Sequence, residues 1–399
     1  MEDQNPPQAP PQPPQELSLR SLLQEMIQKG ASDLHLTVGN RPKLRVDGDL
    51  VNAQSPAVLN PRDTLQLSYS ILTEAQKKRF ETEDELDFSF GVQNLSRFRG
   101  NVYKQRGCVA MAIRQIPYEI ISVEKLGLPP ILNQLSERPR GLILVTGPTG
   151  SGKSTTLAAM VDKINRERKS HIITIEDPIE FLHRNKKSTI NQREIGTDTV
   201  SFKSALRAAL RQAPKVILVG EMRDRETIEI ALEAGETGHL VISTLHTIDA
   251  PKTIDRIIGV FPKNEEAALR ARLASAVKWV ISQRLIPTKS GGRIAAIEIL
   301  RTSERTRDYI IHGSRDGKSL HDVMRDGYTT LGTQTFDMVL KDYVEKGILS
   351  IETALLYATN ANDLKVQLGD KINEAKPGVK GGEAGGGDMD LELDVKDLI

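Results

Sequence analysis

The chain of 399 residues lacks several features that would assign it to a familiar class. Its one cysteine, Cys108, has no partner for an internal disulfide, and no group of Cys and His residues has the spacing of a zinc site. No apolar run approaches the roughly 20 residues of a membrane-spanning helix, and the N-terminus is unlike a signal peptide. We therefore expect a protein of the reducing cytosol that reaches any membrane through a partner.

A strong charge of either sign is also missing. Lys and Arg total 54 against 53 for Asp and Glu, which gives a formal net charge of +1. This balance argues against nucleic acid or an acidic membrane surface as the main partner. The length suffices for two domains with buried cores.

What the chain does contain is a glycine-rich segment directly after the apolar run 142–145. Glycines let successive backbone N–H groups curl around phosphate oxygens and aim the next helix at them. Lys153 brings a cation to the β- and γ-phosphates, and the Ser154 hydroxyl can ligate Mg²⁺. Apolar residues at helical spacing follow, so a strand, a phosphate loop and a helix are predicted in that order. The residues expected to bind ATP are Gly147, Pro148, Thr149, Gly150, Ser151, Gly152, Lys153, Ser154 and Thr155.

Composition and periodicity predict the organisation of the chain. Residues 1–16 are rich in Pro and Gln and are expected to form a disordered tail, while 373–399 form a flexible Gly-rich and acidic one. Residues 17–116 carry the patterns of an α+β domain, including one helix at about 63–81. The Pro- and Gly-containing stretch 117–130 is expected to be a linker. The second domain then covers 131–372, with helices from about 304 to 366.

Within the second domain, apolar strands alternate with helices. This alternation predicts an open, largely parallel α/β sheet with the nucleotide at the carboxyl ends of its strands. The expected strands are 142–146, 172–176, 216–219 and 240–244.

Polar residues follow three of these strands. Taken singly, each has an ordinary explanation: Glu176 and Glu180 as solvated loop acids, Arg223 with Asp224 as a surface pair, and His246 as a structural histidine. Hydrolysis of a γ-phosphate needs a positioned water, a carboxylate to orient it, Mg²⁺ and cations against the developing charge. Since parallel strands end at one edge of a sheet, the clusters together favour an active site.

These segments resemble the motifs of the secretion-type ATPases of bacterial type IV pilus and type II secretion machines, most closely the pilus retraction ATPases. The resemblance covers about residues 17–368. The matching segments are Gly30–Leu36, Ser96–Arg99, the Walker A loop, Ile175–Glu180 as the Asp box, Val219–Asp224 as Walker B, and Glu236–Leu240 with Thr244–Thr247 as the His box.

The resemblance implies a PAS-like α+β domain followed by a RecA-like P-loop ATPase domain, with ATP and Mg²⁺ as cofactors. It implies a cytoplasmic homo-hexameric ring that acts on an inner-membrane platform protein, with a paralogous pilus ATPase as a further candidate partner. Glu180 would be the catalytic base, Glu221 would support Mg²⁺ together with Ser154, and His246 would sense the γ-phosphate. Lys153 keeps its role at the phosphates.

Three arginines of the first domain match positions that contribute to nucleotide at an interface in this family. They are Arg97, Arg99 and Arg114. A guanidinium fork suits the spreading charge of a phosphoryl group. The alternative is that arginines at alternate positions of a strand only solvate its outer face.

The family usually carries an acid on each side of the proline before Walker B, whereas this chain has Ala213 and Lys215 there. It also departs from the family at Ile248 in the His box and in the helical segment 306–313. Three alternatives to a retraction motor remain open. One is the same machine run forward for pilus extension or secretion, although such relatives carry a cysteine-rich zinc insertion. Another is a weakly active scaffold subunit of a retraction motor, and a kinase is the remotest.

Overall fold

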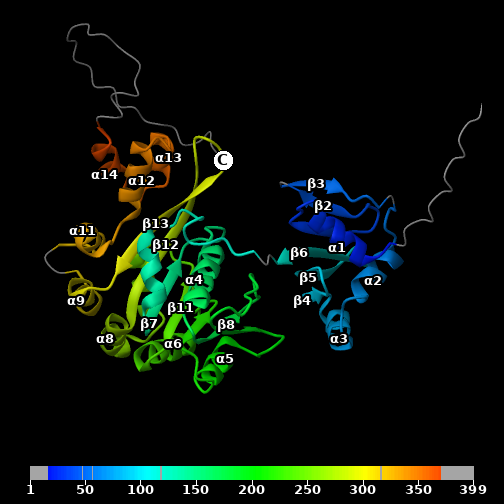
Figure 1. Cartoon of the computed structure of the whole chain (residues 1–399), viewed down its shortest axis with the longest axis horizontal. Coiled ribbons are helices and arrows are strands. Elements are labelled where there is room, and N and C mark those ends of the chain that lie inside the picture. Colours follow the sequence, from blue (N-terminus) through cyan, green and yellow to red (C-terminus); the bar gives the residue numbers. More distant parts are fainter. Residues whose placement is uncertain (1–16, 47, 56, 117–118, 315–316, 370–399) are drawn as a thin grey trace, which may run out of the picture. The chain divides into compact units, whose positions relative to one another are not determined.

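The computed structural model in Figure 1 describes residues 17–46, 48–55, 57–116, 119–314 and 317–369. The tails expected at 1–16 and 373–399 lie outside the described residues. Among the helices that the structure describes, none combines the length and apolar character needed to cross a lipid bilayer.

The first sheet has six strands in the order β3-β2-β1-β6-β5-β4, and every neighbouring pair is antiparallel. Residues on its strands alternate between buried and more exposed positions, as on β5. The apolar side packs with three helices into one core, which contains Leu22, Leu67 and Phe80 from those helices. The elements are α1 (Leu19–Gln28), β1 (Asp33–Leu36), β2 (Lys43–Val46), β3 (Asp49–Asn52), α2 (Pro61–Tyr69), α3 (Glu74–Glu83), β4 (Glu85–Val92), β5 (Ser96–Gln105) and β6 (Cys108–Ile116).

The single helix predicted at about 63–81 is wrong, because the chain forms α2 and α3 there. Thr73 starts the second helix: its hydroxyl accepts from the Gln76 N–H, and the Gln76 side chain accepts from the Thr73 N–H. This capping box satisfies two N–H groups at the helix start. Phe80 is the one buried residue of α3, so apolar periodicity gave no sign of where this helix begins.

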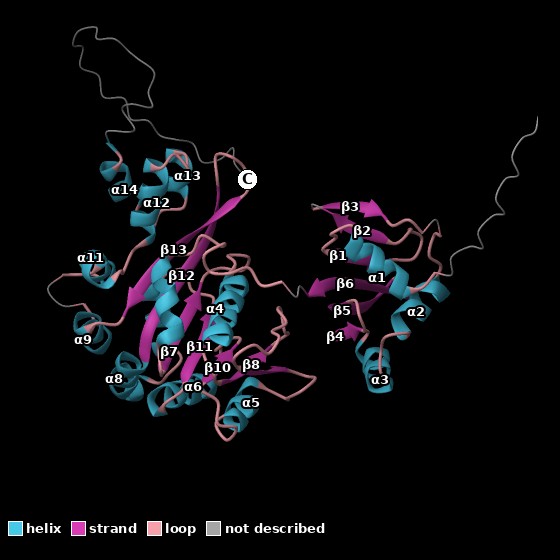
Figure 2. Cartoon of the chain, viewed as in Figure 1, coloured by secondary structure: helices cyan, strands magenta, loops and turns pink. Residues whose placement is uncertain are grey.

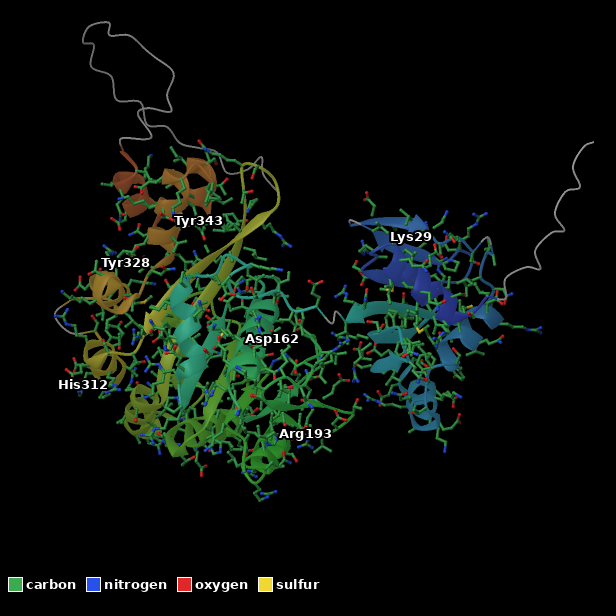
Figure 3. The ribbon with its side chains drawn as sticks, in the orientation of Figure 1. Lys29, Asp162, Arg193, His312, Tyr328 and Tyr343 are labelled. Atoms are coloured by element: carbon green, nitrogen blue, oxygen red, sulfur yellow. The ribbon has the colours of Figure 1, made fainter. Side chains whose placement is uncertain are left out.

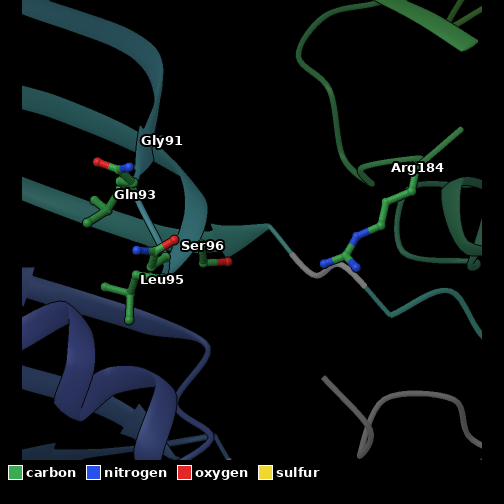
Figure 4. Close-up of a pocket in the computed structure, with 7 residues that line it drawn as sticks. Gly91, Gln93, Leu95, Ser96 and Arg184 are labelled. Atoms are coloured by element: carbon green, nitrogen blue, oxygen red, sulfur yellow. The ribbon is translucent and has the colours of Figure 1, made fainter.

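A short turn joins β4 to β5 (Figure 4). Asn94 has a φ of 60°, a left-handed conformation that Asn adopts more readily than most residues. The Leu95 N–H donates to the Val92 carbonyl at 3.0 Å and closes the turn. This turn fixes the register that places Arg99 opposite Ser89.

The second sheet has seven strands in the order β13-β12-β7-β11-β10-β8-β9. The six strands from β12 to β9 run parallel, as the sequence predicts for its core. Three central strands are buried at every position, with separate apolar clusters on the two faces. The strands are β7 (Gly141–Thr146), β8 (His171–Glu176), β9 (Thr189–Glu194), β10 (Val216–Val219), β11 (Leu240–Leu245), β12 (Val277–Pro287) and β13 (Arg293–Arg301).

Helices surround this sheet (Figure 2). They are η1 (Pro130–Glu137), α4 (Lys153–Glu167), α5 (Phe202–Ala209), α6 (Arg225–Thr237), α7 (Ala250–Ile258), η2 (Lys263–Glu265), α8 (Glu266–Ala276), α9 (Glu304–His312), α10 (Leu320–Asp326) and α11 (Tyr328–Leu331). A further compact unit consists, within the described residues, of 286–293 and 336–369. It contains α12 (Phe336–Glu345), α13 (Ile351–Leu356) and α14 (Ala361–Gln367).

Candidate active site

The segment after β7 forms a loop that only glycine allows at several positions. Gly147, Gly150 and Gly152 have φ angles of 146°, 79° and 87°, in the region that L side chains rarely adopt. A Cβ on Gly147 would lie 2.4 Å from the carbonyl oxygen of Gln283. The loop thus lies directly against β12, as well as between β7 and α4.

The N-terminus of α4 is free of a side-chain cap. Gly152 occupies the N-cap position and offers no side-chain acceptor, whereas Asp224 and Asp249 cap α6 and α7 with their carboxylates. The first N–H groups of a helix need partners outside it and carry the positive end of the helix dipole. An anion such as a phosphate satisfies both needs.

Lys153 folds over the loop in the structure. Its Nζ donates to the carbonyls of Gly147 at 2.8 Å and Pro148 at 2.9 Å. Burial lowers the pKa of Lys153, while the charges of Glu221 and Glu180 oppose this shift. The lysine is therefore a half-buried cation with two acids in its neighbourhood, ready to exchange carbonyl partners for phosphate oxygens.

The parallel strands that precede the predicted clusters are neighbours in the sheet, so the clusters lie side by side where these strands end. β11 ends beside β7 and leads to His246, and β10 is next and leads to Glu221. The Glu221 carboxylate accepts from the Arg223 Nε at 2.6 Å and lies 3.4 Å from the His246 Nε2. Burial raises the pKa of Glu221, but Arg223 and His246 outweigh it, so the pKa lies below its ordinary value. Glu221 is held as a carboxylate.

Glu176 and Glu180 differ in their surroundings. The Glu176 carboxylate accepts from the Thr174 hydroxyl at 2.6 Å and from the Gln192 side chain at 3.2 Å. Burial raises the pKa of Glu176, with smaller opposing hydrogen bonds. Glu180 is exposed and ends the same segment. Glu176 thus holds the segment that follows β8 in place, whereas Glu180 presents its carboxylate to solvent.

The loop that carries Glu180 is fastened to α4. Asp162, labelled in Figure 3, is buried on α4 and pairs with the Lys186 Nζ at 2.5 Å and the Arg166 Nε at 3.0 Å. One turn further, the Asn165 side chain donates to the Arg184 carbonyl at 2.7 Å. The helix that begins at the phosphate loop therefore also fixes the segment that follows Glu180.

The three arginines of the first domain share one face of their sheet. Arg99 and Arg114 are directly opposite each other on β5 and β6, and Arg97 lies two positions from Arg99. The Arg114 Nε donates to the Asp33 carboxylate at 2.8 Å, and the Arg45 Nε lies 3.4 Å from the same carboxylate. Arg99 is exposed, 3.7 Å from an oxygen of Asp87 on β4. Of the three, Arg114 is held most closely within its own domain.

Three polar side-chain contacts near the loop were not predicted. The Thr146 hydroxyl donates to the Ser282 hydroxyl on β12 at 2.9 Å, and Thr156 donates to the Gln283 side chain at 2.7 Å. Thr247 and Thr253 add a hydroxyl contact of 2.6 Å behind His246. Ser282, Gln283 and Arg284 interrupt the mostly apolar segment 277–287, and this interruption is the signal that could have identified the β12 residues.

Metal binding by protein side chains alone has little support. Across the described residues, no three His, Cys, Asp or Glu side chains gather as a metal site. A hydroxyl on α4, Ser154, and a carboxylate after β10, Glu221, nevertheless provide the hard oxygen donors that Mg²⁺ prefers when phosphates and water complete its shell.

Comparisons with known proteins agree on one family. The model for the type II/IV secretion system protein family matches residues 9–292. The type IV pilus retraction ATPase PilT of Pseudomonas aeruginosa is 48% identical over 85% of this chain and 97% of that protein. A twitching motility protein of Neisseria gonorrhoeae is 45% identical over 81% of this chain and 86% of its own length. The crystal structure of the pilus retraction motor PilT with bound ADP is 46% identical, with a TM-score of 0.81 over 88% of this chain and 100% of that one. The chain therefore belongs to the type II/IV secretion system protein family.

Proposed function

We propose that the protein is an ATP-hydrolysing motor that powers type IV pilus retraction, and hence twitching motility. The observation that carries the proposal is the uncapped start of α4, with Lys153 beside it and acids from the neighbouring strands near that lysine. A phosphate loop without hydrolytic groups would need only the first part of this arrangement. The names and extents of the relatives support the pilus as the target.

In the proposed reaction, the N–H groups of 147–153 and the start of α4 hold the phosphates, and Lys153 neutralises them. Glu180 orients the attacking water and accepts its proton. His246 contacts the γ-phosphate and passes its presence to Glu221, whose carboxylate lies 3.4 Å from the His246 Nε2. Ser154 and Glu221 would hold Mg²⁺, which supplies charge neutralisation between the phosphates.

The working assembly we propose is a cytoplasmic homo-hexamer at an inner-membrane platform protein. Residues 17–116 serve as a PAS-like domain, 117–130 as a linker and 131–372 as a RecA-like ATPase domain. Arg97, Arg99 and Arg114 supply positive charge to a nucleotide at a subunit boundary. Their common face on one sheet supports this role, because three guanidinium groups there can meet one ligand.

The test of the hydrolytic site compares two neighbouring acids. We expect Glu180→Gln to keep ADP and Mg²⁺ binding and to lose turnover by roughly a hundredfold, since a general base is removed at constant volume. Glu176→Gln is the matched control and should retain more activity, because its carboxylate serves the loop. The pair is measured by phosphate release and by calorimetric ADP titration. A dead Glu176→Gln beside an active Glu180→Gln would reverse the assignment of the base.

The direction of work needs a test in cells. A strain without the protein should carry excess pili and fail to twitch if the motor retracts. Bald cells would instead indicate the extension motor. No turnover by the purified wild-type protein at saturating ATP would favour the scaffold subunit.

A further inference from the structure

Gln283 lies against the phosphate loop although it is distant in sequence. It is on β12, the strand that pairs in parallel with β7, and only 3% of it is exposed. Its Oε1 accepts from the Thr156 hydroxyl at 2.7 Å, and Thr156 is also buried. A buried amide that loses its partner carries a large desolvation cost, so this hydrogen bond is one that the fold must keep.

The same residue touches both ends of the loop. A Cβ on Gly152 would lie 2.7 Å from the Gln283 Nε2, and one on Gly147 would lie 2.4 Å from the Gln283 carbonyl oxygen. Gly147 opens the loop, and Gly152 occupies the N-cap position of α4 without a side-chain cap. The main-chain carbonyl of Gln283 therefore lies against the entry of the loop. Its side chain lies against the exit of the loop and, through Thr156, holds the first turn of α4.

This arrangement bears on phosphate binding through the backbone. N–H groups hold a phosphate well only when they already point at a common centre, because reorienting them on binding costs free energy. Glycines supply the required φ angles but do not hold them, since glycine is the most flexible residue. A rigid partner outside the loop removes that freedom.

We propose that Gln283 is a positioning residue that pins the phosphate loop of this protein for nucleotide binding. The inference rests on the proposed nucleotide role of the loop. Gln283 makes no contact with the phosphates in this scheme, and its side chain acts through Thr156 and Gly152. A side chain that merely filled space would affect stability without affecting nucleotide affinity.

The experiment removes the hydrogen bond between Thr156 and Gln283 from either partner. In Gln283→Leu the acceptor is lost, and in Thr156→Val the donor is lost at nearly constant shape. We expect each to weaken ADP binding about tenfold and to raise the KM for ATP similarly, with a smaller change in kcat. Thr156→Ser restores the hydroxyl and should bind ADP like the wild type. Gln334→Leu is the control, because it removes a glutamine that donates to the Ile297 carbonyl at 2.7 Å, away from the loop.

The outcomes separate this inference from the proposed function. If the Gln283→Leu and Thr156→Val double variant is no worse than either single variant, both residues act through one contact, as proposed. Folded Thr156→Val with wild-type ADP affinity would overturn the inference, even where Gln283→Leu fails to fold. Equal loss of affinity in Gln334→Leu would overturn it as well, by showing a general effect of stability. Absence of ADP binding by the wild type would instead overturn the proposed function.

Discussion

The two sheets of this protein distribute their polar groups in opposite ways. In the second sheet the central strands are buried along their whole length, so polar side chains gather after the strand ends. In the first sheet one face packs on the core and the other is polar, so charged side chains occur along the strands themselves, as at Asp33, Arg99 and Arg114. Parallel sheets are covered on both faces, whereas antiparallel sheets often have one solvated face.

The difference teaches where chemistry can arise in each sheet. An edge where several parallel strands end brings different groups to one point, and this suits a site with one base, one cation and one sensor. A solvated face offers a row of similar groups and suits a broad charged contact. Losing one group should therefore be severe at the edge and mild on the face.

The largest effect is expected for Lys153→Ala. In the proposed reaction Lys153 neutralises the phosphates, so its loss should lower turnover at least about a hundredfold. Arg97→Ala and Arg99→Ala should each reduce turnover less, because neighbouring arginines retain positive charge on the face. Phosphate release measures all three, and Lys163→Ala, which removes an ion pair with Glu167 on α4, is the control. Equal losses at Lys153 and Arg99 would break the comparison.

Substitutions at successive core positions should sharpen the comparison between the two sheets. Ile217 and Leu218 on β10 pack into clusters on opposite faces, so Ile217→Ala and Leu218→Ala should both destabilise, by about 2–5 kcal/mol. On β5, Phe98→Ala should cost a similar amount, whereas Arg99→Ala next to it should change stability by less than about 0.5 kcal/mol.

Urea unfolding followed by circular dichroism reports on the whole chain for these four variants. The fluorescence of Trp279, buried on β12, adds a probe of the second sheet. A neutral Leu218→Ala would mean that β10 has only one buried face.

A smaller effect is expected at acidic pH for Asp33. Burial raises the pKa of Asp33, but hydrogen bonds from Ser32 and Arg114 outweigh it and leave the pKa below its ordinary value of 3.8. The stabilisation by this carboxylate is therefore complete above that value and is lost as the pH falls through the lowered one. Asp33→Asn should be less stable than the wild type at neutral pH, and the gap should close in acid.

The measurement is the free energy of unfolding of both proteins from pH 7 to pH 3. Asp49→Asn, which changes an exposed carboxylate on β3 of the same sheet, is the matched variant. A gap between Asp33→Asn and the wild type that stays constant through the acid range would contradict the pKa direction.

The smallest effect is expected at the other end of the second sheet, where its parallel strands begin. Ala213 precedes β10 and has a φ of 51°, which suits Asp or Asn better than Ala. The double variant Ala213→Asp with Lys215→Asp should raise the free energy of unfolding, or strengthen subunit association, by up to about 1 kcal/mol. The electrostatic part of this gain should fade in high salt. Turnover per subunit should stay near wild type. Sedimentation and thermal melting at two salt concentrations provide the measurement, and a large loss of turnover would place these residues in the site.

The sequence predicted the core of the second sheet because four strands contain short, mostly apolar runs. It missed β9, whose residues Thr189–Glu194 are mostly polar and lie at the edge of the sheet. It also missed β12 and β13: α8 ends at Ala276 and β12 begins at the next residue, so no turn residues mark the boundary. The glycine-rich loop between β7 and α4 could be predicted directly, because its signal lies in consecutive residues. The contacts of Gln283 and Asp33 could not, because they depend on which strands become neighbours.

The pairing of Asp33 with Arg114 also has a consequence for the history of the sequence. Asp33 lies in the segment Gly30–Leu36, whereas Arg114 is 81 positions further along the chain. The Arg114 guanidinium partly balances the Asp33 carboxylate, so losing either side chain alone leaves the other charge unbalanced on the sheet. Across related chains, the two positions should change together, and a neutral residue at one should accompany a neutral residue at the other. Arg45, which lies on the other side of Asp33, is the position where a compensating change would arise first.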